Sequence, residues 1–179
     1  MSRVGKKPIP LNSKVKAVLD SKTKVLNISG PLGELSMVIP TNINLDITES
    51  EVLVTVDNPK QKSQKALWGT IRAIINNMVQ GVLEGFTKEV ELNGVGYRME
   101  LGKELMLHIG YSHPVIVQIP SSIKLTLKKN LLSGTSIDKQ ALGNFFSYIH
   151  NLKPCDPYKH KGFKFPGRFY IKKEGKKGK

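Results

Sequence analysis

Cationic, aromatic and chain-stiffening residues alternate along residues 153–170, and this combination suits binding to a nucleic acid. Cations can follow a phosphate backbone, aromatic rings can stack on bases or pack against a folded domain, and prolines keep the chain extended. The cations are Lys153, Lys159, Lys161, Lys164 and Arg168, and the rings are those of Tyr158, Phe163, Phe165, Phe169 and Tyr170. We expect the cations to contact phosphates and most of the rings to pack in the core.

Cys155 and His160 form the one nearby pair of residue types suited to nucleophilic catalysis. The flanking prolines and the cationic tail predict an exposed, extended segment, and the sequence offers no third group to orient the histidine. A cysteine hydrolase is therefore only a distant alternative, and incidental placement of the two residues is favoured.

Other signatures of enzymes and cofactors are missing. The four histidines are scattered, the single cysteine excludes a multi-cysteine metal site, and no phosphate-binding loop or serine nucleophile elbow occurs. Gly94-Val95-Gly96 is a fragment of a dinucleotide fingerprint, because Met99 stands where the third glycine belongs. We interpret these glycines as permitting a bulge or a close backbone approach. The sequence predicts no catalysis, no metal, no cofactor and no small-molecule substrate.

The positive charge lies at the two ends of the chain. Residues 1–16 carry five cations and no acid, residues 153–179 carry ten cations against two acids, and the residues between them are close to neutral within a net charge of +14. A large polyanion fits this pattern, because each cation that meets a phosphate releases condensed counterions. Solvated tails that only aid solubility are the alternative. We expect both tails to be disordered when free and to order on docking.

A repeat with an offset of 80 residues organises the elements that must position these groups. Ile39-Pro40, followed by Ile43 and the next alternating apolar residues, recurs at Ile119-Pro120 followed by Ile123, and both copies predict a half-buried strand. Each copy leads to a helix. The first is expected to begin around Asn58-Pro59 with Gln61 reaching back, and to end at Gly81 and Gly85; the second is expected between Asp138 and Pro154. The apolar stripes are Leu67, Ile71, Ile74, Ile75, Met78, Val79 and Val82 in the first helix, and Ala141, Leu142, Phe145, Phe146, Ile149 and Leu152 in the second.

These patterns predict an α+β fold of two tandem similar domains, each a small antiparallel sheet packed by one helix, with basic extended tails at both ends. The expected domains are residues 1–82 and 83–152, followed by a basic C-terminal extension over residues 153–179. No apolar stretch approaches the ~20 residues of a membrane span, and no apolar signal segment opens the chain, so we expect a soluble, unsecreted protein without a membrane partner.

A series of motifs runs in order along nearly the whole chain. The motifs are Ser2-Arg3-Val4-Gly5-Lys6-Lys7-Pro8-Ile9, Gly30-Pro31-Leu32-Gly33-Glu34-Leu35, Ile75-Asn76-Asn77-Met78-Val79-Gln80-Gly81-Val82, Gly94-Val95-Gly96-Tyr97-Arg98, Gly110-Tyr111-Ser112-His113-Pro114, Ile137-Asp138-Lys139-Gln140 and Tyr158-Lys159-His160-Lys161-Gly162. Taken together, the series resembles the large-subunit ribosomal protein six family in its bacterial and organellar form.

The resemblance implies a non-catalytic structural component of the large ribosomal subunit that binds the large ribosomal RNA near the sarcin-ricin loop. It also implies neighbouring ribosomal proteins, translational GTPases docking nearby, and a bacterial cytoplasmic ribosome, with an organellar ribosome as the alternative. A free-standing cationic RNA-binding module or RNA chaperone is the rival function. The expected RNA-binding residues are Arg3, Lys6, Lys7, Lys153, Tyr158, Lys159, Lys161, Gly162, Lys164, Arg168, Lys172, Lys173, Lys176, Lys177 and Lys179.

The chain departs from the family pattern around His160, where the family usually has glycine. If that position needs a positive φ angle, histidine adopts it only at some energetic cost. After Phe165 the family tends to carry acidic residues, whereas this chain has Pro166-Gly167-Arg168-Phe169.

Overall fold

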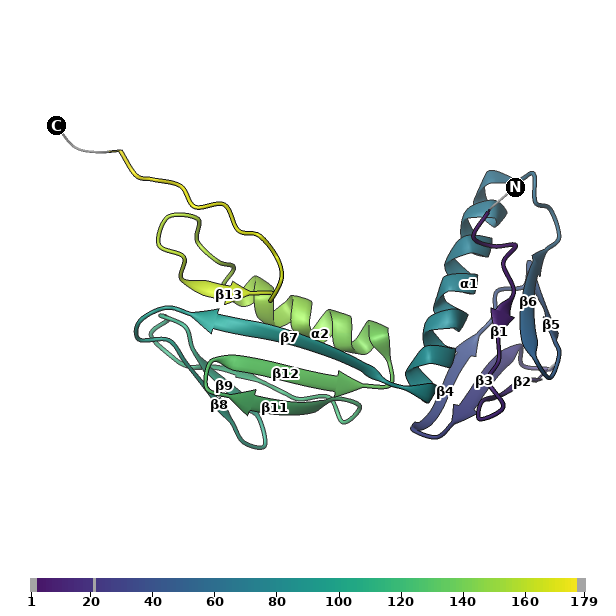
Figure 1. Ribbon diagram of the computed structural model, residues 1–179, viewed down its shortest axis with the longest axis horizontal. Helices are drawn as coiled ribbons and strands as arrows, with labels where there is room; N and C mark the ends of the chain where they lie inside the picture. Colours follow the sequence, from purple (N-terminus) through teal and green to yellow (C-terminus); the bar gives the residue numbers. More distant parts are fainter. Residues whose placement is uncertain (1–2, 21, 177–179) are drawn as a thin grey trace. The chain divides into compact units, whose positions relative to one another are not determined.

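The computed structural model describes residues 3–20 and 22–176, which divide into two compact units (Figure 1). The first unit runs to Gly85 and also includes Ile137–Lys139; the second consists of Phe86–Ser136 and the chain from Gln140 onward. In the described part, each unit has one helix and two small antiparallel sheets, so the α+β class with two similar domains is confirmed. No helix among the described residues is both long and apolar enough to cross a membrane.

The described residues of the first unit form six strands and the longer helix. One sheet has the order β2-β3-β4 and the other β1-β6-β5, and every neighbouring pair is antiparallel. The elements are β1 (Ile9–Pro10), β2 (Lys16–Asp20), β3 (Val25–Gly30), β4 (Gly33–Val38), β5 (Ile43–Ile47), β6 (Glu51–Val56) and α1 (Lys62–Leu83).

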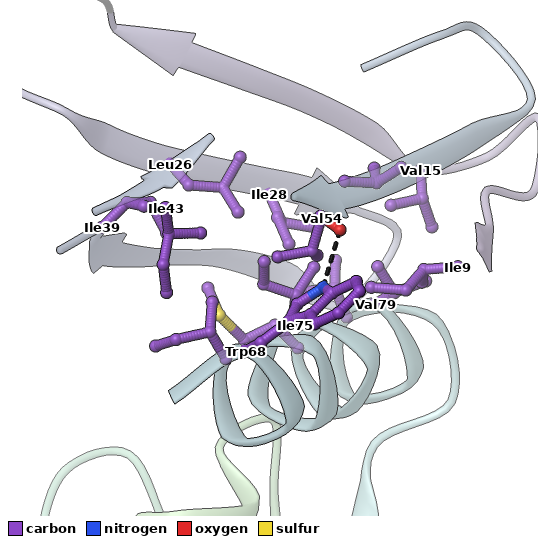
Figure 2. Close-up of a cluster of buried hydrophobic side chains, with 14 residues drawn as sticks. Ile9, Val15, Leu26, Ile28, Ile39, Ile43, Val54, Trp68, Ile75 and Val79 are labelled. Atoms are coloured by element: carbon purple, nitrogen blue, oxygen red, sulfur yellow. Dashed lines mark hydrogen bonds between the residues drawn. The ribbon is translucent and has the colours of Figure 1, made fainter. Parts of the chain in front are cut away.

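Helix α1 packs its apolar stripe on strands of both sheets, and Trp68 is the central residue of this contact (Figure 2). The expected stripe included Leu67, which is 40% exposed, and missed Trp68, which is 7% exposed and donates its indole N–H to the carbonyl oxygen of Val54 at 2.8 Å. The expected capping role of Gln61 is also wrong. Gln64, one turn further along, accepts a hydrogen bond from the backbone N–H of Asn58 at 2.8 Å instead.

The second unit repeats this plan with seven strands and α2 in the described residues. A four-stranded sheet has the order β11-β12-β7-β13 and a three-stranded sheet the order β10-β9-β8. The elements are β7 (Phe86–Asn93), β8 (Arg98–Leu101), β9 (Leu105–His108), β10 (Val115–Val117), β11 (Lys124–Lys128), β12 (Leu131–Ser136), α2 (Lys139–Leu152) and β13 (Gly162–Lys164).

Helix α2 lies along one face of the four-stranded sheet (Figure 1). Phe146 of α2 sits so close to β12 that a Cβ at Gly134 would lie 2.5 Å from its ring, which explains the glycine in that strand. The repeat is visible in the strand pairing as well. β5 and β11, which carry the repeated pattern, each pair antiparallel with the strand that precedes the helix of their own unit.

Candidate nucleic-acid interface

Residues 153–163 form a closed loop between α2 and β13. The backbone N–H of Phe163 donates to the carbonyl oxygen of Lys153 at 2.9 Å, and Pro154 forms an isolated parallel bridge with Phe163. Gly162 has a φ of +128°, and a Cβ there would lie 2.6 Å from the carbonyl oxygen of Pro154. Because β13 then pairs with β7, with Phe163 opposite Leu92, the base of the loop is held by the sheet.

Asp156 organises the tip of this loop. Its carboxylate accepts hydrogen bonds from the backbone N–H groups of Tyr158 and Lys159, both at 3.1 Å, and its carbonyl oxygen accepts one from the N–H of His160 at 2.9 Å. The bonds from Tyr158 and then Lys159 favour the ionised carboxyl, so the pKa of Asp156 lies below its usual 3.8. The only acid of the loop is therefore used internally, and Tyr158 and Lys159 are exposed.

The five aromatic rings of the segment divide between packing and exposure. Phe163 is fully buried, Phe165 stacks on His150 with ring centroids 4.9 Å apart, and the hydroxyl of Tyr170 accepts a hydrogen bond from the N–H of Phe165 at 2.9 Å. Phe163 lies in the core and Phe165 packs against it, so core packing holds for two of the five rings, and the expectation that most of them pack there is wrong. Tyr158 and Phe169 are 56% and 89% exposed, so both can stack on a base. Phe169 was not among the expected RNA-binding residues, although its place between Arg168 and a tyrosine was a usable signal.

The expected cations of this segment all lie in the second unit. Lys159, Arg168, Lys172, Lys173 and Lys176 are exposed, and Lys153, Lys161 and Lys164 are half-buried. None of them forms an ion pair with a carboxylate within the described ranges. Their positive charge is therefore available to an external anion. Lys177 and Lys179 lie outside the described residues.

The glycine-rich turn at residues 94–96 lies beside the basic loop. A Cβ at Gly94 would lie 2.9 Å from the Tyr97 ring and 3.2 Å from Cγ of Lys161, so the interpretation of a close approach is confirmed there. Gly96 has a φ of +85° and open space around it. Lys153 adds a cation nearby on the same unit, with its Nζ 5.0 Å from the centroid of the Tyr111 ring.

The basic N-terminal residues lie on the first unit. Gly5 is buried against Trp68, where a Cβ would lie 2.6 Å from the indole, and Arg72 donates to the carbonyl oxygens of Lys7 and Pro8 at 3.2 and 3.3 Å. Arg3, Lys6 and Lys7 are exposed on this anchored arm.

Both tails were expected to be disordered when free, but the structure gives tertiary contacts to part of each tail. Tertiary contacts hold residues 5–9, and the C-terminal segment is tied back as far as Lys173, whose N–H donates to the carbonyl oxygen of Pro157 at 3.0 Å. The positions expected to bind RNA belong to two separate units, with Arg3, Lys6 and Lys7 in the first and the others in the second.

Cys155 and His160 do not form a catalytic pair. The Cys155 thiol donates weakly to the carbonyl oxygen of Asp156 at 3.6 Å, while Nδ1 of His160 lies 3.4 Å from Nζ of Lys164. Burial, outweighing the nearby Lys164, raises the pKa of the Cys155 thiol and so disfavours the reactive thiolate. His160 has a φ of +55°, so the position does need the positive φ that favours glycine. Among the described residues, no three His, Cys, Asp or Glu side chains are placed to hold a metal ion.

Comparison with known proteins identifies clear relatives. The family described as ribosomal protein L6 matches residues 11–85 and 93–165. The chain is 44% identical to the large ribosomal subunit protein uL6c of Guillardia theta, over all of this chain and 99% of the relative. It is 41% identical to large ribosomal subunit protein uL6 of Thermosynechococcus vestitus over the full length of both, and 39% identical to that of Dictyoglomus thermophilum over all of this chain and 99% of the relative. These matches confirm the resemblance drawn from the motifs, and with it the expectation that the chain is not an enzyme.

Proposed function

The chain belongs to the ribosomal protein L6 family and is a protein of the large ribosomal subunit, and we propose that it binds the large ribosomal RNA through residues 153–176. The binding site on the RNA is near the sarcin-ricin loop, beside the place where translational GTPases dock. The ribosome is of the bacterial or organellar type, since relatives come from both.

The observation that carries this proposal is the set of unpaired cations on residues 153–176 of the second unit, which begin with the closed loop. Eight described cations of residues 153–176 lack a carboxylate partner, and Asp156 is bonded within the loop. A loop already closed by Gly162 and β13 presents its charges with less ordering entropy than a free tail would lose on binding. Lysines outnumber arginines along the segment, which favours contacts to phosphates over bidentate reading of bases.

The two exposed rings add a second mode of contact. Tyr158 and Phe169 each present a face that can stack on an unpaired base, and stacking of this kind is largely independent of sequence. Arg3, Lys6 and Lys7 on the first unit supply a further set of phosphate contacts. Neighbouring large-subunit proteins are the remaining partners.

The salt dependence of binding tests the phosphate contacts. A variant with Lys172, Lys173 and Lys176 changed to Gln should bind an rRNA fragment containing the sarcin-ricin helix less tightly. Its slope of log affinity against log salt should fall by about 2 in magnitude, because each lost phosphate contact removes ~0.7–0.9.

The matched control changes Lys103, Lys124 and Lys128 to Gln, three exposed lysines elsewhere on the same unit. This control removes the same charge, and its slope of log affinity against log salt should stay close to that of the wild type. Equal slopes in the two variants would contradict the assignment of phosphate contacts to Lys172, Lys173 and Lys176. A wild-type chain that binds all RNAs alike and washes off large subunits at moderate salt would favour the rival RNA chaperone.

A further inference from the structure

Two cations meet at the ring of Phe165, outside the lysine-rich tail. Nζ of Lys88, on β7, lies 5.1 Å from the ring centroid, and Cζ of Arg168 lies 5.8 Å from it. His150 of α2 stacks on the same ring with an interplanar angle of 16°. Phe165 therefore contacts both cations through its ring while α2 supports the ring.

Neither cation is neutralised by a neighbour in the described residues. Lys88 and Arg168 form no ion pair. The nearest acid in the sequence, Glu89, lines the same hollow, but its carboxylate accepts a hydrogen bond from Ser133 at 2.9 Å and forms no ion pair within the described residues. Both cations line one hollow, so an anion placed in it is attracted to both.

The space beside them is large enough for a polymer and open to it. A hollow of about 690 Å³ is bounded by the start of β7, by α2 and by residues 165–168; Thr87 and Ser147 add hydroxyl groups to its walls, and Glu89 adds one carboxylate. The hollow is open to solvent rather than enclosed. An extended strand can therefore lie in it, with a phosphate between the cations and hydroxyl donors close by.

We propose that Lys88 and Arg168 form a phosphate-binding site for the RNA backbone at Phe165, separate from the lysines of residues 172–176. The inference rests on the proposed function, since it names a further contact to the same RNA. Lys88 is half-buried and lies in a near-neutral stretch of sequence, so the charge pattern of the chain does not reveal it. Arg168 completes the site from the segment that follows β13.

Single and double substitutions in the full chain test the site. Lys88→Gln and Arg168→Gln should each weaken binding to the rRNA fragment roughly fivefold and lower the salt slope by about 1. The double variant should lose less than the product of the single losses, because both side chains bind one phosphate. Lys88→Arg keeps the charge and should keep the wild-type slope.

Lys124→Gln is the matched control, an exposed lysine two strands away from β7 in the same sheet. If Lys88→Gln behaves like Lys124→Gln, or if Lys88→Arg loses as much as Lys88→Gln, the phosphate site is refuted while wild-type binding to rRNA still upholds the proposed function. ATP and inorganic phosphate, tested as competitors and by direct titration, separate the sources of phosphate. Binding of ATP that depends on Lys88, with RNA binding unaffected, would assign the hollow to a free nucleotide and overturn the proposal.

Discussion

Lys153 and Phe163 are joined by a backbone hydrogen bond of 2.9 Å that closes the basic loop on itself. The bond links the residue that follows α2 to the middle of β13, so the cations between them are presented on a fixed loop. Gly162 makes the contact possible, because only a residue without a Cβ fits between the two chain segments.

Gly162→Ala should therefore open the loop. The new methyl group would meet the carbonyl oxygens of Lys153 and Pro154 at 2.7 and 2.6 Å, and φ at this position is +128°. We expect a loss of at least about 2 kcal/mol in local stability. Hydrogen exchange of the Phe163 amide should accelerate, and affinity for rRNA should fall with it.

Gly143→Ala is the control for Gly162→Ala, because a Cβ at Gly143 in α2 meets nothing within 4 Å. That change should be neutral or stabilise the helix by up to about 1 kcal/mol. Unchanged exchange at Phe163 in the Gly162→Ala variant would show that the loop does not depend on the close approach.

Relief of backbone strain is expected from His160→Gly. A histidine at φ +55° adopts a region that glycine occupies without penalty, so the substitution should stabilise the second unit by about 0.5–1 kcal/mol in urea unfolding. His113 is exposed and has no positive φ, so His113→Gly should destabilise or have no effect. Destabilisation by His160→Gly would show that the contact with Lys164 outweighs the strain.

The carboxyl of Asp156 makes the stability of the loop depend on pH. Its pKa is lower in the folded chain than the ordinary 3.8, because it accepts N–H bonds from Tyr158 and Lys159. The stabilisation is therefore fully present above pH 3.8 and is lost as the pH falls through the lower folded value. Asp156→Asn should show faster amide exchange at Tyr158 and Lys159 at pH 7, after correction for intrinsic rates, and the difference should shrink in acid. A difference that stays constant down to low pH would contradict this role.

The anchored N-terminal arm should be released by Arg72→Gln. Arg72 donates to the carbonyl oxygens of Lys7 and Pro8, so its loss should speed tryptic cleavage after Lys6. Arg98→Gln removes the same charge from an exposed residue of the second unit and is expected to leave that cleavage rate unchanged. Equal cleavage rates in the wild type and the Arg72 variant would mean that the Arg72 hydrogen bonds do not hold the arm.

The helices and the repeat were predictable because their signals are local and periodic. The apolar stripes at helical spacing placed α1 and α2, and the alternation after Pro40 and Pro120 placed β5 and β11. The errors in the predicted apolar stripe of α1 concern single positions. Leu67 and Trp68 are both apolar neighbours, and only packing against Val54 shows which one faces the core.

Tertiary contacts hold the N-terminal arm and residues 153–176 in place, and the charge pattern of the sequence does not reveal these contacts. β13 ends at Lys164, before Pro166, and its pairing partner β7 is distant in sequence. The contact of Gly5 with Trp68, and the meeting of Lys88 with Arg168 on Phe165, likewise join residues far apart in the chain. The sequence identified the cations, and the fold shows how they are held.

Density for this chain in the assembled large ribosomal subunit tests the central claim most directly. The account predicts that the side chains of Lys161, Arg168 and Lys172 lie within hydrogen-bonding distance of ribosomal RNA phosphates, with residues 153–163 closed as described. Side chains that point into solvent away from every nucleotide, with the loop still closed, would contradict it.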